Sequence, residues 1–192
     1  MLAQLISRVR RNHGLEHATI HMLSAKHKNF NAQGNSDHRG FRLNIFGEIS
    51  QDDVVQAVEE AYRRMKGGEH QLAVHPNCGT VLLTTATMAT LAAETTFAME
   101  QKRQQRTSTN SSVLINALPT AILAVVVALI ISRPLGVHLQ ARYTTEGDLK
   151  GLQVSRIRQV PPSLVTRLFQ LLLTPGKSQL KVTSYAIETI DS

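Results

Sequence analysis

Three histidines lie at four-residue intervals near the start of the chain: His13, His17 and His21. Residues four apart lie on one face of an α-helix, so the imidazoles of His13 and His17 can bind a single metal ion. Glu16 immediately precedes the second histidine and is expected to point into the same space. The stretch from His13 to His17 therefore has an H-x-x-E-H arrangement, which predicts a zinc-type metal site.

A second group of metal-type ligands comes from His70 and from His75-Pro76-Asn77-Cys78. His75 and Cys78 are separated by two residues, a spacing that lets a turn bind one ion. Combined with the helix, this turn could complete a tetrahedral set of Cys and His ligands. The expected ligands are His13, His17, His75 and Cys78. Two further histidines could contribute, His21 and His70.

The sequence leaves three interpretations of these residues open. Four protein ligands would make the site structural, whereas an open position for water beside Glu16 would make it hydrolytic. In the third interpretation the histidines are packed in the core, and the protein is a non-catalytic membrane assembly or scaffold factor. A buried polar side chain without a partner costs about 1–3 kcal/mol, so the histidines need partners in every case.

The H-x-x-E-H stretch resembles the metal-binding helix of the inverzincin metallopeptidases, the insulinase and pitrilysin group. By this resemblance His13 and His17 would bind zinc and Glu16 would be the catalytic base, which implies a membrane metallohydrolase or metallopeptidase. The third ligand in that family is a glutamate far downstream. Glu94 has a comparable separation, but it would lie roughly 24 Å from Cys78 along a regular helix, so that position is unfilled.

An apolar run without charged residues covers positions 113–132. It is long enough to cross a bilayer and predicts a transmembrane helix. A second segment, about 80–98, is rich in Thr and Ala and suits close packing against another membrane helix. The polar connection between them, 100–112, is short. We therefore expect a transmembrane hairpin, domain 79–133, in an integral membrane protein whose main partner is the lipid bilayer.

Polar residues of the hairpin predict one internal contact and an orientation. Glu94 in the first span and Asn116 in the second are expected at matching depth, where they would form an intramembrane hydrogen bond. Positive residues are more frequent near the outer ends of the hairpin than in its connecting loop, which favours cytoplasmic termini. The outer residues are Arg63, Arg64, Lys66, Arg133, Arg142 and Lys150, and those in the loop are Lys102, Arg103 and Arg106.

The segment before the hairpin predicts an N-terminal α/β domain, 1–78. Residues 1–25 have an amphipathic helical pattern, and the side with Leu2, Leu5, Ile6 and the histidines is expected to be buried. A loop at 29–39 and a strand at 41–49 follow. A helix over 51–66 is predicted to begin after the cap Ser50 and to end at Gly67.

The segment after the hairpin predicts a small C-terminal α/β appendage, 134–192. It contains a strand at 152–160, a helix from Pro161 to about Leu173 and a strand at 180–190. The expected fold class is α+β with membrane helices, built from two soluble parts and a membrane part.

The amino-acid composition limits the classes of partner that the chain is expected to bind. The net charge of +7 is compatible with nucleic acid, but an aromatic content of 4% provides few stacking platforms. Anionic lipid headgroups are the simpler partner, together with a membrane protein complex, and no nucleic acid is expected. The single cysteine, Cys78, excludes an internal disulfide.

Three stretches of the sequence together resemble an uncharacterised family of cyanobacterial membrane proteins. They are Asn12-His13-Gly14-Leu15-Glu16-His17-Ala18-Thr19-Ile20, His75-Pro76-Asn77-Cys78-Gly79-Thr80 and Arg133-Pro134-Leu135-Gly136. The resemblance covers most of the chain. It implies a two-span protein of a plasma or thylakoid membrane and is silent on a substrate.

Overall fold

The chain folds into two compact units. The computed structural model describes residues 1–108, 110–164, 166–167 and 182–191. The first unit combines Met1–His75 with Ala141–Ser192, and the second is Pro76–Gln140. Both ends of the sequence therefore belong to the same unit, and the predicted separate C-terminal appendage is not formed.

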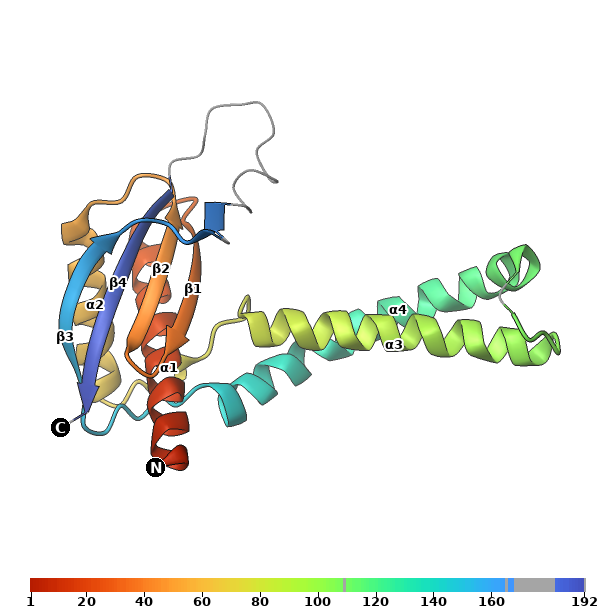
Figure 1. Cartoon of the computed structure of the whole chain (residues 1–192), viewed down its shortest axis with the longest axis horizontal. Coiled ribbons are helices and arrows are strands. Elements are labelled where there is room, and N and C mark those ends of the chain that lie inside the picture. Colours follow the sequence, from red (N-terminus) through yellow and green to blue (C-terminus); the bar gives the residue numbers. More distant parts are fainter. Residues whose placement is uncertain (109, 165, 168–181, 192) are drawn as a thin grey trace. The chain divides into compact units, whose positions relative to one another are not determined.

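In the described part of the chain, one antiparallel sheet of four strands, in the order β1-β2-β4-β3, joins the two ends of the sequence (Figure 1). The strands are β1 (Asn31–Asp37), β2 (Gly40–Phe46), β3 (Leu152–Val160) and β4 (Val182–Asp191). β4 pairs with β2 on one side and with β3 on the other. Two strands alone are marginally stable in water, whereas in the common sheet β3 and β4 share one core with the N-terminal elements. The helix predicted from Pro161 to Leu173 falls largely outside the described residues.

Residues 31–37 form strand β1 in place of the predicted loop. β1 is polar, and its side chains alternate between exposed and partly buried. It is an edge strand that pairs with β2 in a register in which Asp37 lies opposite Gly40. Gly40 has a φ of +148°, which a glycine adopts without steric cost. The pairing with a buried neighbour outweighs the weak strand propensity of these residues.

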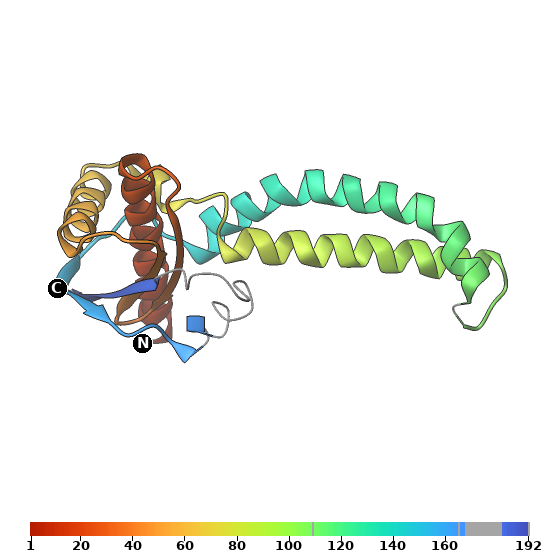
Figure 2. The ribbon, with the colours of Figure 1, turned by 90° about the horizontal axis from the view of Figure 1, so that it is seen from above.

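Two helices, α1 (Leu2–Lys26) and α2 (Gln51–Lys66), cover one face of the sheet (Figure 1, Figure 2). α2 has the predicted bounds, and Ser50 caps it by accepting a hydrogen bond from the amide of Asp53. The core between helices and sheet is made of large apolar side chains with almost no exposed surface. They include Leu15, Leu23, Leu43, Ile45, Val54, Val58, Met65, Tyr185 and Ile187.

α1 is longer than the sheet that it covers. Its 25 residues span about 37 Å, whereas β1 and β2, with seven residues each, span about 23 Å and the longest strand, β4 with ten residues, spans about 33 Å. Its first turns therefore extend past the sheet, and Leu2, Leu5 and Ile6 are 71%, 46% and 49% exposed. The prediction that these three residues are buried is wrong, although Leu15 on the same helix is fully buried.

The second unit is a hairpin of two helices, α3 (Gly79–Arg103) and α4 (Ser111–Leu139). Both are long and apolar enough to cross a membrane. Each is longer than the predicted span, because α3 continues past residue 98 and α4 continues through Pro134 into a π-helical segment, Gln140–Thr144. An apolar run indicates the part of a helix that suits lipid, while the helix itself can continue into polar sequence.

The hairpin has small residues inside and large apolar residues outside. The buried residues of α4 are Val113, Ala117, Ala121, Ala128, Ser132 and Gly136. Large side chains on the outer surface of α4 include Ile115, Leu118, Ile122, Leu123 and Ile130. A Cβ on Gly136 would lie 2.9 Å from the Cα of Val81, so the two backbones approach closely there. Close packing through small residues, with large apolar ones outward, is typical of membrane helices.

The structure does not bring Glu94 and Asn116 together through a hydrogen bond. Both side chains are exposed, and the Asn116 amide instead donates to Ser112 Oγ at 3.4 Å. Because α3 extends to Arg103, Glu94 lies nine residues before its end, whereas Asn116 lies five after the start of α4. At 1.5 Å per residue the two depths differ by about 6 Å. Within the described hairpin, a polar contact between the helices joins Ser132 to Thr85, with the two Oγ atoms 3.0 Å apart.

Candidate metal centre

The rings of His13 and His17 are neighbours on α1, with centroids 4.4 Å apart. Nδ1 of His13 lies 2.9 Å from the carbonyl oxygen of Thr144, and Nδ1 of His17 lies 2.8 Å from that of Ala73. A carbonyl oxygen only accepts hydrogen bonds, so Nδ1 carries the hydrogen in both rings. In a neutral ring Nε2 then has the lone pair that a metal ion binds.

His75 lies beside the same row of rings. Its centroid is 5.8 Å from that of His17 and 4.9 Å from that of His21. It follows the short 3₁₀ helix η1 (His70–Ala73). Its position is fixed because the backbone carbonyls of the two preceding residues are hydrogen-bonded to α1. His17 donates to the first of these carbonyls, and His21 Nε2 donates to the second, that of Val74, at 2.9 Å. The structure thus gathers three predicted ligands and one further candidate: His13, His17, His75 and His21.

Cys78 follows His75 by three residues and is the N-cap of α3. Three residues of extended chain reach at most about 11 Å, so the chain confines this thiol to the neighbourhood of the histidine cluster. His13, His17 and Cys78 form a candidate metal-binding group. His70, the other predicted candidate, is exposed at the start of η1.

The carboxylate of Glu16 faces strand β1. Glu16 is 4% exposed, and its Oε2 accepts a hydrogen bond from Ser36 Oγ at 2.5 Å. A Cβ on Gly34 would lie 1.8 Å from Glu16 Oε1, so this glycine leaves the space that the carboxylate occupies. Sequence reasoning did not connect Gly34 or Ser36 with the site, although a glycine inside a strand marks a close approach. The role of Glu16 as a catalytic base stays a prediction.

Gly14, inside the H-x-x-E-H stretch, is the point at which two distant segments contact α1. One segment is 70–75, which precedes the hairpin, and the other is 141–147, which follows it. A Cβ on Gly14 would lie 3.1 Å from the Cβ of Ala73 and 2.5 Å from the carbonyl oxygen of Glu146. A glycine in a helix interior costs about 1 kcal/mol relative to alanine, and this close packing explains its presence.

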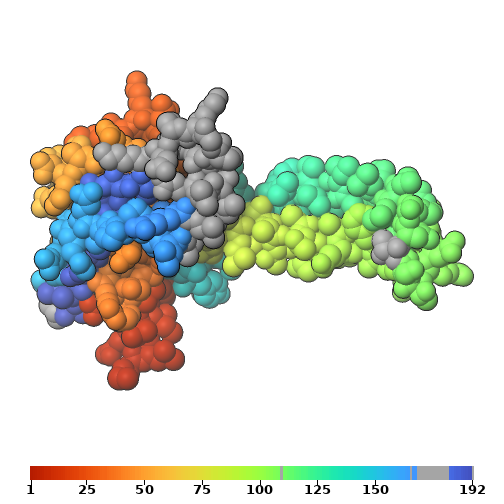
Figure 3. Space-filling model, turned by 45° about the horizontal axis from the view of Figure 1, so that its top comes forward, coloured from red at the N-terminus to blue at the C-terminus, as the bar shows by residue number. Residues whose placement is uncertain are grey.

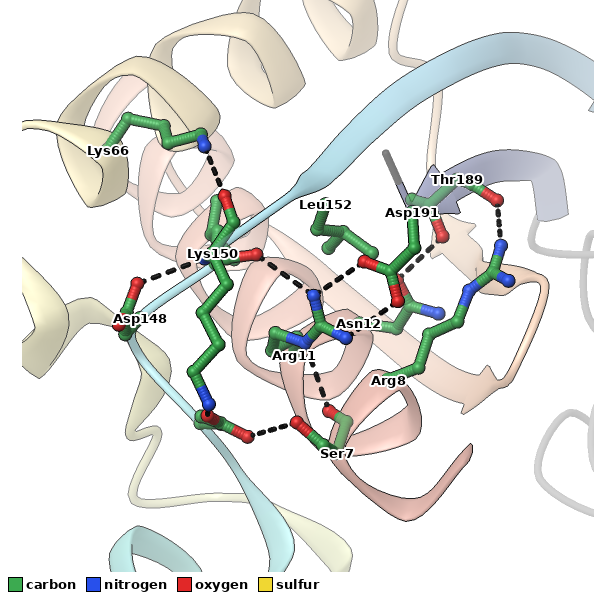
Figure 4. Close-up of polar contacts among 12 residues, drawn as sticks. Ser7, Arg8, Arg11, Asn12, Lys66, Asp148, Lys150, Leu152, Thr189 and Asp191 are labelled. Carbon is green, nitrogen blue, oxygen red and sulfur yellow. Dashed lines mark hydrogen bonds and ion pairs between the residues drawn. The ribbon is translucent and has the colours of Figure 1, made fainter. Parts of the chain in front are cut away.

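A separate polar network attaches α1 to the end of β4 (Figure 4). Both terminal nitrogens of Arg11 donate to the carboxylate of Asp191, at 2.6 and 2.7 Å. Asn12 donates to the carbonyl of Asp37 at 2.8 Å and accepts from Thr189 Oγ1 at 2.8 Å. The hydrogen bonds from Arg11 lower the pKa of Asp191 although burial opposes this. The network orients α1, and with it the histidines, on the sheet.

The sequence over residues 8–157 matches the model of a family described as a domain of unknown function, DUF6391. The chain belongs to the DUF6391 family. The matched range contains most of the histidine helix, the hairpin and most of β3, and the expected resemblance to an uncharacterised cyanobacterial family is thereby confirmed.

One relative of this DUF6391 chain is an uncharacterized protein of Picosynechococcus sp. (strain ATCC 27264 / PCC 7002 / PR-6). It is 37% identical over 94 residues, a region that makes up 42% of this chain and 45% of that protein. The match therefore spans less than half of the relative's length. No solved structure matches the chain.

Proposed function

We propose that this DUF6391 protein is an integral membrane protein that binds one zinc-type metal ion beside the histidine face of α1. The observation that carries the proposal is the pair of hydrogen bonds from His13 and His17 to backbone carbonyls. Metal-binding histidines commonly donate their second ring nitrogen to a carbonyl or carboxylate, which fixes the tautomer and the ring orientation. The proposed ligands are His13, His17 and Cys78.

The donor set supports zinc. Two imidazoles and one thiolate are ligands that zinc takes in a tetrahedral arrangement, and a thiolate compensates part of the charge of the ion. His75 is the candidate for the fourth position, since its ring lies 5.8 Å from that of His17. A fourth protein ligand would close the site to water. Together with the contact between Glu16 and Ser36, this favours a structural site over a hydrolytic one.

The arrangement of the hairpin supports membrane insertion. Its large apolar side chains are exposed and its small ones are buried, which is unfavourable in water and suitable in lipid. We place both termini in the cytoplasm, with a plasma or thylakoid membrane as the location. The bilayer is the first partner, and a membrane protein complex is the second.

Metal analysis of the full chain, purified in detergent after growth with zinc, tests the site. We expect one zinc per chain, which is lost in the variant His13→Ala/His17→Ala. The matched control is His27→Ala/His38→Ala, which removes two histidines outside the cluster and retains the metal. With Co²⁺ in place of zinc, a thiolate-to-metal absorption band should appear in the wild type and disappear in Cys78→Ser. A wild-type protein without stoichiometric metal contradicts the proposal.

A metal-free scaffold is the second candidate, and one observation favours it. The hydrogen bonds of His13 and His17 tie both segments that flank the hairpin, through Thr144 and Ala73, to a single helix. The histidines would then hold the two segments on α1 through these hydrogen bonds, without a metal ion. A chelator distinguishes the two functions: it should lower the melting temperature of the purified protein if the site holds zinc, and leave it unchanged if the histidines only pack.

A further inference from the structure

The first two turns of α1 carry an exposed apolar surface. At 100° per residue Leu2, Leu5 and Ile6 fall on one side of the helix. They are about half exposed or more, and Met1 is fully exposed. In the space-filling view this end of α1 projects from its unit (Figure 3). Apolar side chains gathered at one projecting end indicate a contact surface.

The segment that follows the second membrane helix is bound to these same turns. Arg10 Nη2 donates to the carbonyls of Arg142 and Thr145, at 2.9 and 3.0 Å. Ser7 Oγ donates to the carboxylate of Glu146 at 2.9 Å, and the amide of Glu146 donates to the carbonyl of Arg10 at 3.0 Å. The start of α1 is therefore fixed beside the residues with which the chain leaves α4.

The bound segment has the composition of a membrane interface. Tyr143 is 62% exposed, and Arg142 beside it is exposed as well. Tyrosine is enriched at the level of the lipid headgroups, and arginine can reach their phosphates from a position near the end of a span. These side chains together form the interfacial patch, which consists of Leu2, Leu5, Ile6, Tyr143, Arg10 and Arg142.

We propose that the interfacial patch lies in the headgroup region of the bilayer, with its apolar side chains inserted and its arginines at anionic lipids. This inference rests on the membrane insertion proposed above. The first acidic residue of the chain is Glu16, so the N-terminal end of α1 carries only positive charge. Two copies of the patch would repel each other, whereas a negatively charged lipid surface attracts it, which makes lipid the favoured occupant over a second copy.

The absence of tryptophan from the chain allows a direct test. A single tryptophan is placed in the full-length protein, reconstituted in vesicles of phosphatidylcholine and phosphatidylglycerol, and its quenching by lipids brominated on the acyl chains is measured. Leu5→Trp reports on the interfacial patch. Glu59→Trp, at an exposed position of α2, is the matched control, and Ile122→Trp, on the outer surface of α4, reports on membrane insertion.

We expect brominated lipid to quench Leu5→Trp and Ile122→Trp and to leave Glu59→Trp unquenched. Quenching of Ile122→Trp alone, with a water-exposed emission spectrum for Leu5→Trp, overturns the interfacial patch and leaves the membrane insertion standing. If the emission of Leu5→Trp is blue-shifted but is not quenched by brominated lipid, protein covers the patch, which also overturns the proposal. If Ile122→Trp is not quenched, the membrane insertion itself is wrong and the inference falls with it.

Discussion

Gly14 and Glu146 are packed backbone to backbone, although they are far apart in the sequence. A Cβ at position 14 would lie 2.5 Å from the carbonyl oxygen of Glu146, closer than real Cβ contacts. The amide of Glu146 also donates to the carbonyl of Arg10, one turn earlier on α1. The chain that returns from the hairpin is thus fixed against the histidine helix at the beginning of the H-x-x-E-H stretch.

Substitution of Gly14 by alanine should destabilise the first unit. The added methyl group meets a backbone oxygen that cannot move without displacing the segment 141–147, and overpacking of this kind costs about 1–3 kcal/mol. Gly79→Ala is the matched control, because a Cβ at Gly79 meets nothing within 4 Å. Denaturant unfolding of the detergent-purified protein measures both variants. Alanine in a helix interior is favoured over glycine by about 1 kcal/mol, so a Gly14→Ala variant more stable than the wild type by this amount would show that the contact is not formed.

Local signals in the sequence predicted the elements whose boundaries depend on neighbouring residues. Ser50 as a cap, acidic residues in the first turn and Gly67 at the end gave the bounds of α2, Gln51–Lys66. The strand at 152–160 was also predicted from a local signal, the alternation of its side chains. That β4 lies between β2 and β3 depends on pairing across the sequence, which no local pattern encodes, and the two ends of the chain were therefore predicted as separate parts.

The candidate site was predicted in part. The spacing of His13 and His17 and the density of ligands near His75 led to the cluster that the ring distances describe. The contact between Glu16 and Ser36 depends on where the edge strand lies, and the 29–39 segment was predicted as a loop. The depth of Glu94 was misjudged because hydropathy ends the first span before the helix ends.

The ion pair between Arg11 and Asp191 should make stability depend on pH in the acid range. The hydrogen bonds from Arg11 hold the pKa of Asp191 below its unfolded value, which is about 3.9. The stabilisation is therefore complete above that value and is lost as the pH falls through the lower pKa of the folded protein. In Asp191→Asn this part of the pH dependence should disappear.

The same substitution should also lower stability at neutral pH. Arg11 is 6% exposed and would keep its charge with fewer acceptors, and a hydrogen bond to a charged group contributes about 1.5–3 kcal/mol. Partial exposure of the carboxylate favours the lower end of this range. The matched control is Glu60→Gln, which removes the partner of Arg63 on the surface of α2 and should change stability much less. An acid profile of Asp191→Asn identical to that of the wild type would contradict this assignment.

Glu16 offers a test that separates folding from catalysis. The variant Glu16→Gln keeps an oxygen that can accept from Ser36, so it should retain the fold and the full metal content. Glu16→Leu removes the acceptor and should cost about 1–3 kcal/mol, because the Ser36 hydroxyl loses its partner. Unfolding curves and zinc content of both variants measure this. If the site is structural, Glu16→Gln has no effect beyond these two measurements. If Glu16→Gln instead loses a hydrolytic activity while it keeps its fold and its metal, the catalytic interpretation is restored.

Close contact between α3 and α4 should depend on Gly136. A Cβ there would lie 2.9 Å from the Cα of Val81, so Gly136→Val forces the two helices apart. Ile130→Val, at a position that is 68% exposed on the outer surface, is the control and should have little effect. Resistance of the hairpin to unfolding in sodium dodecyl sulfate measures the difference. Equal resistance of the two variants would mean that the helices do not pack through Gly136.

The connecting loop of the hairpin should face away from the cytoplasm. Two membrane crossings put both termini on one side, and positive residues near the ends of spans favour the cytoplasmic side. Six such residues lie near the outer ends of the hairpin, and three lie near its connecting end, where Lys102 and Arg103 belong to the last turn of α3. The outer residues are Arg63, Arg64, Lys66, Arg133, Arg142 and Lys150, and those at the connecting end are Lys102, Arg103 and Arg106. In intact cells a membrane-impermeant maleimide should label Ser108→Cys, which lies in the loop, and should label Glu59→Cys on α2 only after permeabilisation. The wild type, with Cys78 alone, measures the background. Labelling of Glu59→Cys but not of Ser108→Cys in intact cells would invert the orientation, and it would place the histidine cluster, which shares a unit with α2, on the outer side of the membrane.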